Sequence, residues 1–493
     1  MAFTRFAVLL GALFAISPAR AADLSSAQAA ALEAQLHTWL ASLVEPAFAL
    51  PTRPVQLTAE GDHLSVLLPI AGLDGDAAPK AVTAIARPGE HGTWVVSDIR
   101  LPSPASISVT VPVKDGKRIT QHTSWAIGEQ QGQMVIDPAL GVVTSSNFAV
   151  HGLDVRSDSE LGHTQQHYDL YSGETTATPA ANGRLDFAET ARVDGMRVHS
   201  DGHDQPSFDL TARKLSARGD LTGVDIGQAS RVVAASTKLI AASMATASTA
   251  GGAHDLKHMR PVDRQAVRTL LAALNDVALG LRGEETVDDL AIQALGQEVK
   301  LAHVAIGMGV EAPARKLRAS VKLALEGFAA PQLPHEYADL LPTRIALEPV
   351  VSGIGTADLE RLMMAATEPD ANEQTMAPAV AKVFADGGVT VGLENVRIEM
   401  PGTSLGGKME VRLLGPQSVQ GVARIEASGL DRLIDRAKAD PTLSQALPFL
   451  ILARGLAKPD GEGLAWDITF DESRKVVVNG TDLSQIAGGA PHR

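Results

Sequence analysis

Residues 389–413 read VTVGLENVRIEMPGTSLGGKMEVRL, and apolar and polar side chains alternate along most of this stretch. Within residues 389–400 the apolar parity changes once, at Glu394-Asn395, which is consistent with one extra residue in the strand. This change predicts a β-bulge. Alternation with period two is typical of antiparallel strands that have one apolar and one polar face. The apolar positions before and after the bulge are Val389, Val391, Leu393, Val396, Ile398 and Met400.

The same alternation recurs in other stretches of the chain. Residues 107–113 alternate before Asp115-Gly116, a pair that suits the two central positions of a type I′ hairpin turn. Hairpins of this kind predict an α+β, β-rich fold, with long curved antiparallel sheets and short amphipathic helices packed on one face. If the C-terminal strands are neighbours, their apolar positions form one continuous surface. The candidate ligand-facing positions on it are Leu464, Trp466, Ile468, Phe470, Val411, Leu413, Val391 and Leu393.

The sequence allows two alternatives for what covers this apolar surface. A bare apolar area of that size favours aggregation, so something must lie over it. One cover is a pair of helices, predicted after Gly353 and after Gly429, whose apolar residues recur at three- and four-residue steps. The other cover is a bound lipid acyl chain that shares the same space.

The N-terminus predicts export through a cleavable signal peptide. Arg5 supplies a positive charge, and the apolar stretch Phe6 to Ile16 is too short to span a bilayer. Ala19-Arg20-Ala21 has the small-residue pattern of a cleavage site, with Ala19 and Ala21 as its key positions. We therefore expect a periplasmic protein that begins at Ala22 and has no stable transmembrane span after cleavage.

The chain is expected to fall into four parts. Residues 1–21 are the signal peptide, and residues 22–215 form an N-terminal helix followed by an antiparallel β region. Residues 216–287 are predicted to be a helical segment, and residues 288–493 a C-terminal β region built from strand–helix repeats.

Composition excludes several classes of function. The 493 residues carry a formal net charge of −14, which argues against nucleic acid as a partner. The chain has no cysteine, so disulfides, cysteine–zinc sites and thiol catalysis are excluded. Nucleophile-elbow, phosphate-loop and dinucleotide-binding motifs are absent from the sequence, which predicts a protein without cofactor or catalytic activity.

Histidine pairs are the closest approach to a metal site. Three pairs stand four residues apart, and on a helix that spacing places both imidazoles on one face. Only His254 and His258 lie near a predicted helix, so this pair is the weak metal candidate. The other two pairs, His163/His167 and His199/His203, lie in predicted strand and turn regions.

Two C-terminal motifs carry a resemblance to a known family. RIEASGLDRLI at Arg424 to Ile434 joins a strand to a helix, and WDITF at residue 466 is followed by VVVNGT ending at Thr481. Together they resemble the AsmA-like periplasmic envelope proteins, and more narrowly exported bacterial families of unknown function with a C-terminal VxVNG hairpin. The resemblance implies an elongated, curved sheet with an apolar inner face, tied to lipid transfer or envelope assembly.

Two functions follow as hypotheses. The first is a non-catalytic periplasmic protein that binds or guides a lipid or other apolar ligand in envelope maintenance, with a lipid or an envelope protein as partner. The alternative is a secreted hydrolase acting on a cell-wall or sugar polymer. Aromatic residues are only 4% of the chain, which counts against the alternative because sugar-binding clefts rely on stacking platforms.

Overall fold

The computed structural model places strands and short helices between residues 55 and 483. The predicted signal-peptide positions Ala19 and Ala21, the turn at Asp115-Gly116, and His203, His254 and His258 lie outside the described residues. No described helix is long and apolar enough to cross a membrane. The described residues are 55–70, 73–74, 81–112, 118–140, 142–202, 206–229, 231–232, 265, 267–269, 277–312, 315–334, 340–368, 370–385, 387–415, 418–440, 443–461, 463–473 and 475–483.

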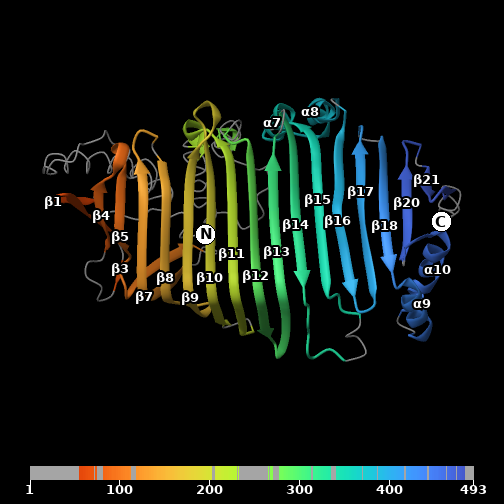
Figure 1. Cartoon of the computed structure of the whole chain (residues 1–493), viewed down its shortest axis with the longest axis horizontal. Coiled ribbons are helices and arrows are strands. Elements are labelled where there is room, and N and C mark those ends of the chain that lie inside the picture. Colours follow the sequence, from red (N-terminus) through yellow and green to blue (C-terminus); the bar gives the residue numbers. More distant parts are fainter. Residues whose placement is uncertain are drawn as a thin grey trace. The chain divides into compact units, whose positions relative to one another are not determined.

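The fold is β-rich and antiparallel, as the alternation predicts, with 65% of the residues in strands and a few short helices (Figure 1). Two compact units are present. Unit 1 comprises Met1–Leu281 with Ile292–Gly296 and Thr367–Pro369, and unit 2 comprises Arg282–Ala291, Gln297–Ala366 and Asp370–Arg493.

Unit 1 is a succession of hairpins whose strands become very long. The pairing order is β1–β2–β4–β5–β7–β8–β9–β10–β11, with β6 also on β7 and β3 on β6. A buried cluster of side chains from the first strands and from the end of β7 forms its core. The strands are β1 (Gln56–Glu60), β2 (His63–Pro69), β3 (Leu73–Asp74), β4 (Ala81–Pro88), β5 (Trp94–Arg100), β6 (Ala105–Pro112), β7 (Arg118–Asp137), β8 (Val142–Ser159), β9 (Gly162–Pro179), β10 (Leu185–Gly202) and β11 (Phe208–Val224).

Two glycines inside the long strands change which side chains are buried. Gly152 in β8 and Gly195 in β10 both have φ of 60°, a left-handed conformation that glycine adopts without strain. Val150 and Leu153 are both buried although they differ in parity, because the alternation reverses at Gly152. A simple period-two reading of these strands therefore fails at the glycines.

Unit 2 is a sheet with the order β13–β14–β15–β16–β17–β18–β20, and β19 and β21 pair with β20. Strand β22 closes a hairpin with β21. Strand β12 (Gly280–Ala294) is divided between the two units. The elements of unit 2 are β13 (Gln297–Glu311), β14 (Lys316–Glu326), β15 (Arg344–Gly355), α7 (Thr356–Ala366), α8 (Glu373–Ala385), β16 (Val389–Met400), β17 (Thr403–Leu413), β18 (Val419–Ser428), α9 (Leu430–Ala439), α10 (Leu447–Leu456), β19 (Lys458–Asp460), β20 (Gly463–Phe470), β21 (Val476–Val478) and β22 (Thr481–Asp482).

The bulge predicted at Glu394-Asn395 is present, since the register of β16 with β17 shifts between Leu393 and Val396. The two predicted helix starts are also found: α7 begins at Thr356, and α9 begins directly after Gly429. The sequence misplaced the edges of the helical segment 216–287. Residues 216–224 belong to β11 and residues 280–287 to β12, because these stretches continue the ladders of long strands.

Candidate functional site

The register of unit 2 gathers apolar side chains on one face of five neighbouring strands. Val391 of β16 stands opposite Val351 of β15 and Val411 of β17, and β14 and β13 continue the row. The bulge in β16 keeps Val396 on this face, because Val396 pairs with Leu347 and Gly407. We call this surface the apolar face: Val304, Ile306, Met308, Val310, Ala319, Val321, Leu323, Leu325, Ile345, Leu347, Val351, Val389, Val391, Leu393, Val396, Ile398, Leu405, Met409, Val411 and Leu413.

Several large side chains of the apolar face remain in contact with solvent. Met308 is 54% exposed, Val321 is 49% exposed and Ile306 is 48% exposed. Val391, Leu405 and Met409 are each 37% exposed. Side chains of this size are usually buried, so a group of them on adjacent strands makes this surface a candidate binding site.

The opposite face of the same strands is charged. Arg318 donates to Glu394 at 2.6 Å, and Arg344 Nε lies 3.2 Å from a carboxylate oxygen of Glu326. Lys322 Nζ lies 3.9 Å from Glu284. These exposed pairs add little stability, but they mark this side as the one that faces water. The polarity of the two faces therefore differs sharply.

Helices cover the other end of the predicted ligand-facing surface. Leu464, Trp466 and Ile468 of β20 pack in one cluster with α9 and α10. Trp466 is only 8% exposed, and its Nε1 donates to the carbonyl oxygen of Ala453 in α10 at 2.8 Å. Phe470, also on β20, lies against Gly421 of β18.

The predicted ligand-facing residues thus divide into two groups. Leu464, Trp466 and Ile468 belong to a helix-covered core, whose covers are α9 and α10. The helix after Gly353, which is α7, lies with α8 at one end of β14–β16 (Figure 1). Four of the other five lie on the apolar face: Val391 is exposed, and Leu393, Val411 and Leu413 are half-buried. Phe470 belongs to neither group and is half-buried against Gly421.

The sequence analysis missed the most exposed part of the apolar face, in β13 and β14. A signal was present, because residues 303–310 read HVAIGMGV and place Val304, Ile306, Met308 and Val310 on one parity. After His303 the other parity holds the small residues Ala305, Gly307 and Gly309, so the alternation there is one of side-chain size.

Unit 1 holds a second candidate, a groove of about 790 Å³ that crosses β6–β11. Its floor includes a row of directly paired side chains, from Trp125 of β7 through Val155 and Val198 to Leu210 of β11. In β9 the row contains Gln166, whose Oε1 accepts a hydrogen bond from Tyr168 at 2.7 Å. All of these side chains are half-buried, so the apolar face of unit 2 is the more exposed of the two candidates.

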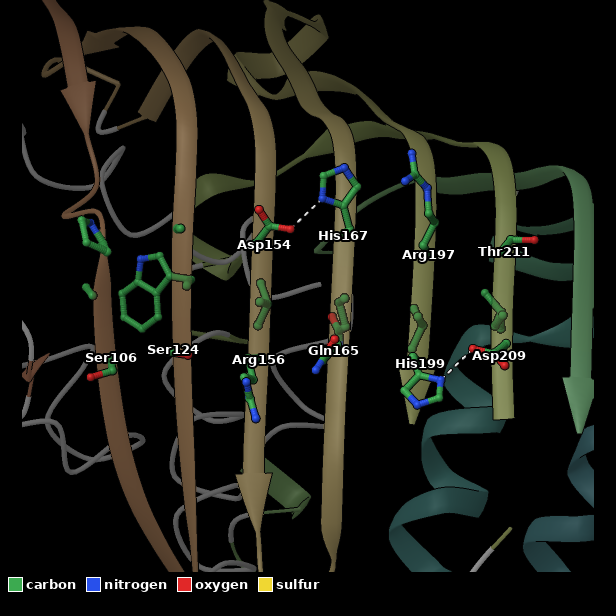
Figure 2. Close-up of a pocket in the computed structure, with 18 residues that line it drawn as sticks. Ser106, Ser124, Asp154, Arg156, Gln165, His167, Arg197, His199, Asp209 and Thr211 are labelled. Atoms are coloured by element: carbon green, nitrogen blue, oxygen red, sulfur yellow. Dashed lines mark hydrogen bonds and ion pairs between the residues drawn. The ribbon is translucent and has the colours of Figure 1, made fainter. Parts of the chain in front are cut away.

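In β8–β11 most residues next to this row are charged, and their side chains alternate to the opposite side of the strands, where they form pairs (Figure 2). His167 lies between two carboxylates: Nδ1 is 2.7 Å from Asp154 and Nε2 is 3.0 Å from Asp169. His199 has the same arrangement, at 2.7 Å from Asp209 and 2.8 Å from Asp201. An ionised carboxylate only accepts hydrogen bonds, so the protonated ring, in which both nitrogens donate, is the form that satisfies both contacts.

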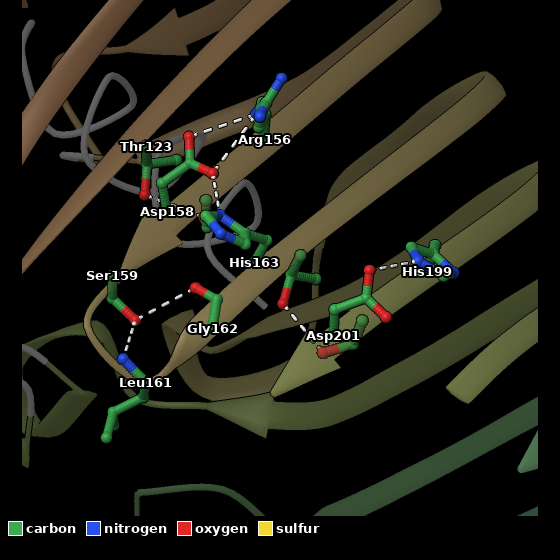
Figure 3. A network of polar contacts seen from close by, with 12 residues as sticks. Thr123, Arg156, Asp158, Ser159, Leu161, Gly162, His163, His199 and Asp201 are labelled. Carbon is green, nitrogen blue, oxygen red and sulfur yellow. Dashed lines mark hydrogen bonds and ion pairs between the residues drawn. The ribbon is translucent and has the colours of Figure 1, made fainter. Parts of the chain in front are cut away.

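The pKa values agree with this geometry. The hydrogen bond to Asp154 raises the pKa of His167, and the hydrogen bond to Asp209 raises the pKa of His199. At the tip of the β8–β9 hairpin, His163 Nδ1 lies 2.6 Å from Asp158, and this contact lowers the pKa of Asp158 (Figure 3). His163 and His167 therefore lie on a strand, as the sequence predicts, and each contacts a carboxylate. Within the described part of the chain, no group of three ligating side chains can hold a metal ion.

Comparison with family models, with curated proteins and with solved structures found no match for this chain. The resemblance to the AsmA-like proteins therefore remains a prediction from the two C-terminal motifs.

Proposed function

We propose that the protein is an exported, non-catalytic periplasmic protein that holds or guides a lipid acyl chain on the apolar face of unit 2. Its role would be in maintenance of the cell envelope. The observation that carries the proposal is the exposure of large apolar side chains, from 37% at Val391 to 54% at Met308, across adjacent strands.

The dimensions of the apolar face suit an acyl chain. Strands in a sheet are about 4.8 Å apart, so β13 to β17 extend over roughly 20 Å. A bilayer has a hydrocarbon core of about 30 Å, so one acyl chain reaches about 15 Å. A chain laid across the strands therefore fits within the face.

The chemistry of the face favours an acyl chain over an extended peptide. Strands β14–β17 each have a partner on both sides, so their backbone hydrogen bonds are made within the sheet. An extended peptide laid on this face would lose water from its own N–H and C=O groups without gaining partners. An acyl chain has no such groups, and burial of each methylene contributes about 0.8 kcal/mol.

Native mass spectrometry of the protein purified without detergent tests the proposal. We expect a population whose added mass corresponds to a lipid or fatty acid. A chain that is always free of lipid, and that does not bind added oleate, would contradict the proposal.

Matched variants locate the binding surface. Val391→Asp puts a charge on the apolar face, whereas Val422→Asp puts the same charge on the opposite face, where Val422 is 55% exposed. Val391→Asp should weaken oleate binding at least tenfold, and Val422→Asp should leave it unchanged. Equal losses in both variants would argue against the apolar face as the site.

A further inference from the structure

Helix α10 is apolar on two sides, and only one side is packed. Its inner residues Leu447, Leu450, Ala453 and Leu456 recur at three-residue steps and join the cluster around Trp466. Its outer residues are left in solvent: Phe449 is 74% exposed, Ile451 is 53% exposed and Leu452 is 51% exposed. A helix that is apolar all round is normally buried on both sides, and among the described residues of unit 2 none covers the outer side.

The outer side of α10 is free of charge. Arg454 is the charged residue of this helix, and its Nε donates to Asp431 of α9 at 2.9 Å. The guanidinium is thereby held toward α9. A surface that contacts Phe449, Ile451 and Leu452 therefore buries only apolar atoms, and no charged group has to lose its hydration.

The size of the patch distinguishes between partners. Three exposed side chains offer at most a few hundred Å², whereas a stable protein interface buries about 800 Å² on each partner. A lipid surface needs no such area or shape, since a short helix with an apolar side lies in the boundary between headgroups and acyl chains. A lipid surface is therefore the occupant that a patch of this size fits.

The position of α10 in unit 2 adds a second argument. The helix packs over Ile425 of β18 and Trp466 of β20, and β18 is the neighbour of β17, the last strand of the apolar face. An apolar surface therefore continues from Met409 and Val411 to the strands beneath α10. A lipid surface in contact with α10 would stand beside one edge of the apolar face.

We infer that α10 docks unit 2 on a lipid surface by inserting Phe449, Ile451 and Leu452 among the acyl chains. This docking places the apolar face next to a source of acyl chains. The role in lipid exchange rests on the proposed function, whereas the docking itself is a separate property of the helix.

Flotation with vesicles of palmitoyl-oleoyl-phosphatidylcholine tests the inference on the full chain. The wild type should float with the vesicles, and the double variant Phe449→Ser/Leu452→Ser should lose at least 90% of the floating fraction. Met308→Ser is the control, because Met308, at 54% exposed, matches Leu452, at 51% exposed, but lies on the apolar face. It should float like the wild type and bind oleate less well.

These variants separate the two proposals. Both the proposed function and the docking inference are supported if only Met308→Ser loses oleate binding and only the α10 variant loses flotation. A wild type that binds oleate but does not float overturns the docking inference and leaves the proposed function standing. A dimer in sedimentation velocity that the α10 variant abolishes, with no flotation of the wild type, would assign the patch to a second copy and also overturn the inference.

A single labelled cysteine tests insertion of α10 without the double variant, which could lose flotation simply because it misfolds. The chain has no cysteine of its own, so Phe449→Cys gives one labelling site for nitrobenzoxadiazole. The emission of this label should shift to the blue on addition of vesicles. An unchanged spectrum would contradict insertion of α10.

Discussion

Trp466→Ala tests whether α9 and α10, and not a ligand, cover the end of the sheet formed by β18 and β20. The Trp466 side chain is 8% exposed and packs in the cluster with both helices. A tryptophan buries about 200 Å², which at about 25 cal/mol per Å² corresponds to about 5 kcal/mol of transfer free energy. Large-to-small replacements in cores typically cost about 3–5 kcal/mol, so we expect a loss in this range.

The hydrogen bond of Trp466 is tested separately. Trp466→Phe keeps most of the apolar area but removes the donor to Ala453. This variant should lose about 1 kcal/mol for the hydrogen bond, plus a smaller term for the reduced volume. The pair of variants therefore divides the stability of the cluster into packing and hydrogen bonding.

Urea unfolding followed by circular dichroism measures both variants. Delipidated protein must show the full loss for Trp466→Ala, because the cover consists of the chain's own helices. The oleate content of the folded variant should stay unchanged. If Trp466→Ala lowers the free energy of unfolding of delipidated protein by less than about 1 kcal/mol and also reduces oleate binding, the helix-covered core at this end is refuted. Trp466 would then belong to the ligand-binding surface.

Three further predictions concern other parts of the chain. The raised pKa values of His167 and His199 mean that their stabilisation is complete below the ordinary pKa of 6.5 and is lost as the pH rises through the higher folded values. The melting midpoint of unit 1 should therefore fall from pH 6.5 upward, and a slope that persists in the double variant His167→Gln/His199→Gln would contradict this. Burial raises the pKa of Glu189, so Glu189→Gln should raise the melting midpoint at pH 8, and a lower midpoint would count against that account. Ala21→Leu should block processing, because the peptidase accepts only small residues there. N-terminal sequencing that still finds Ala22 in this variant would contradict the need for a small residue at position 21.

The sequence predicted the parts of the fold that depend on local alternation. The bulge at Glu394-Asn395 follows from a change of parity within one strand, and the inner residues of α9 follow from three- and four-residue steps. Both signals lie within about a dozen residues, so no long-range contact is needed to read them.

Which residues cover the apolar surface depends on long-range packing, so the local pattern of apolar residues could not predict it. α10 begins after a short turn and is apolar on all sides, so its periodicity does not show which side faces Trp466. The reversal at Gly152 depends on a left-handed backbone that the sequence does not reveal. The carboxylate partners of His167 come from β8 and from its own strand, and the β8 partner depends on the register of a hairpin.

The central claim, that the apolar face of unit 2 binds an acyl chain, is tested most directly by a fluorescent label on each face. Val391→Cys and Val422→Cys place acrylodan on opposite faces of the same sheet, in a chain without other cysteines. Addition of oleate should shift the emission of the label at position 391 in a saturable manner and leave the label at position 422 unchanged. No shift at position 391, or equal shifts at both positions, would contradict the claim.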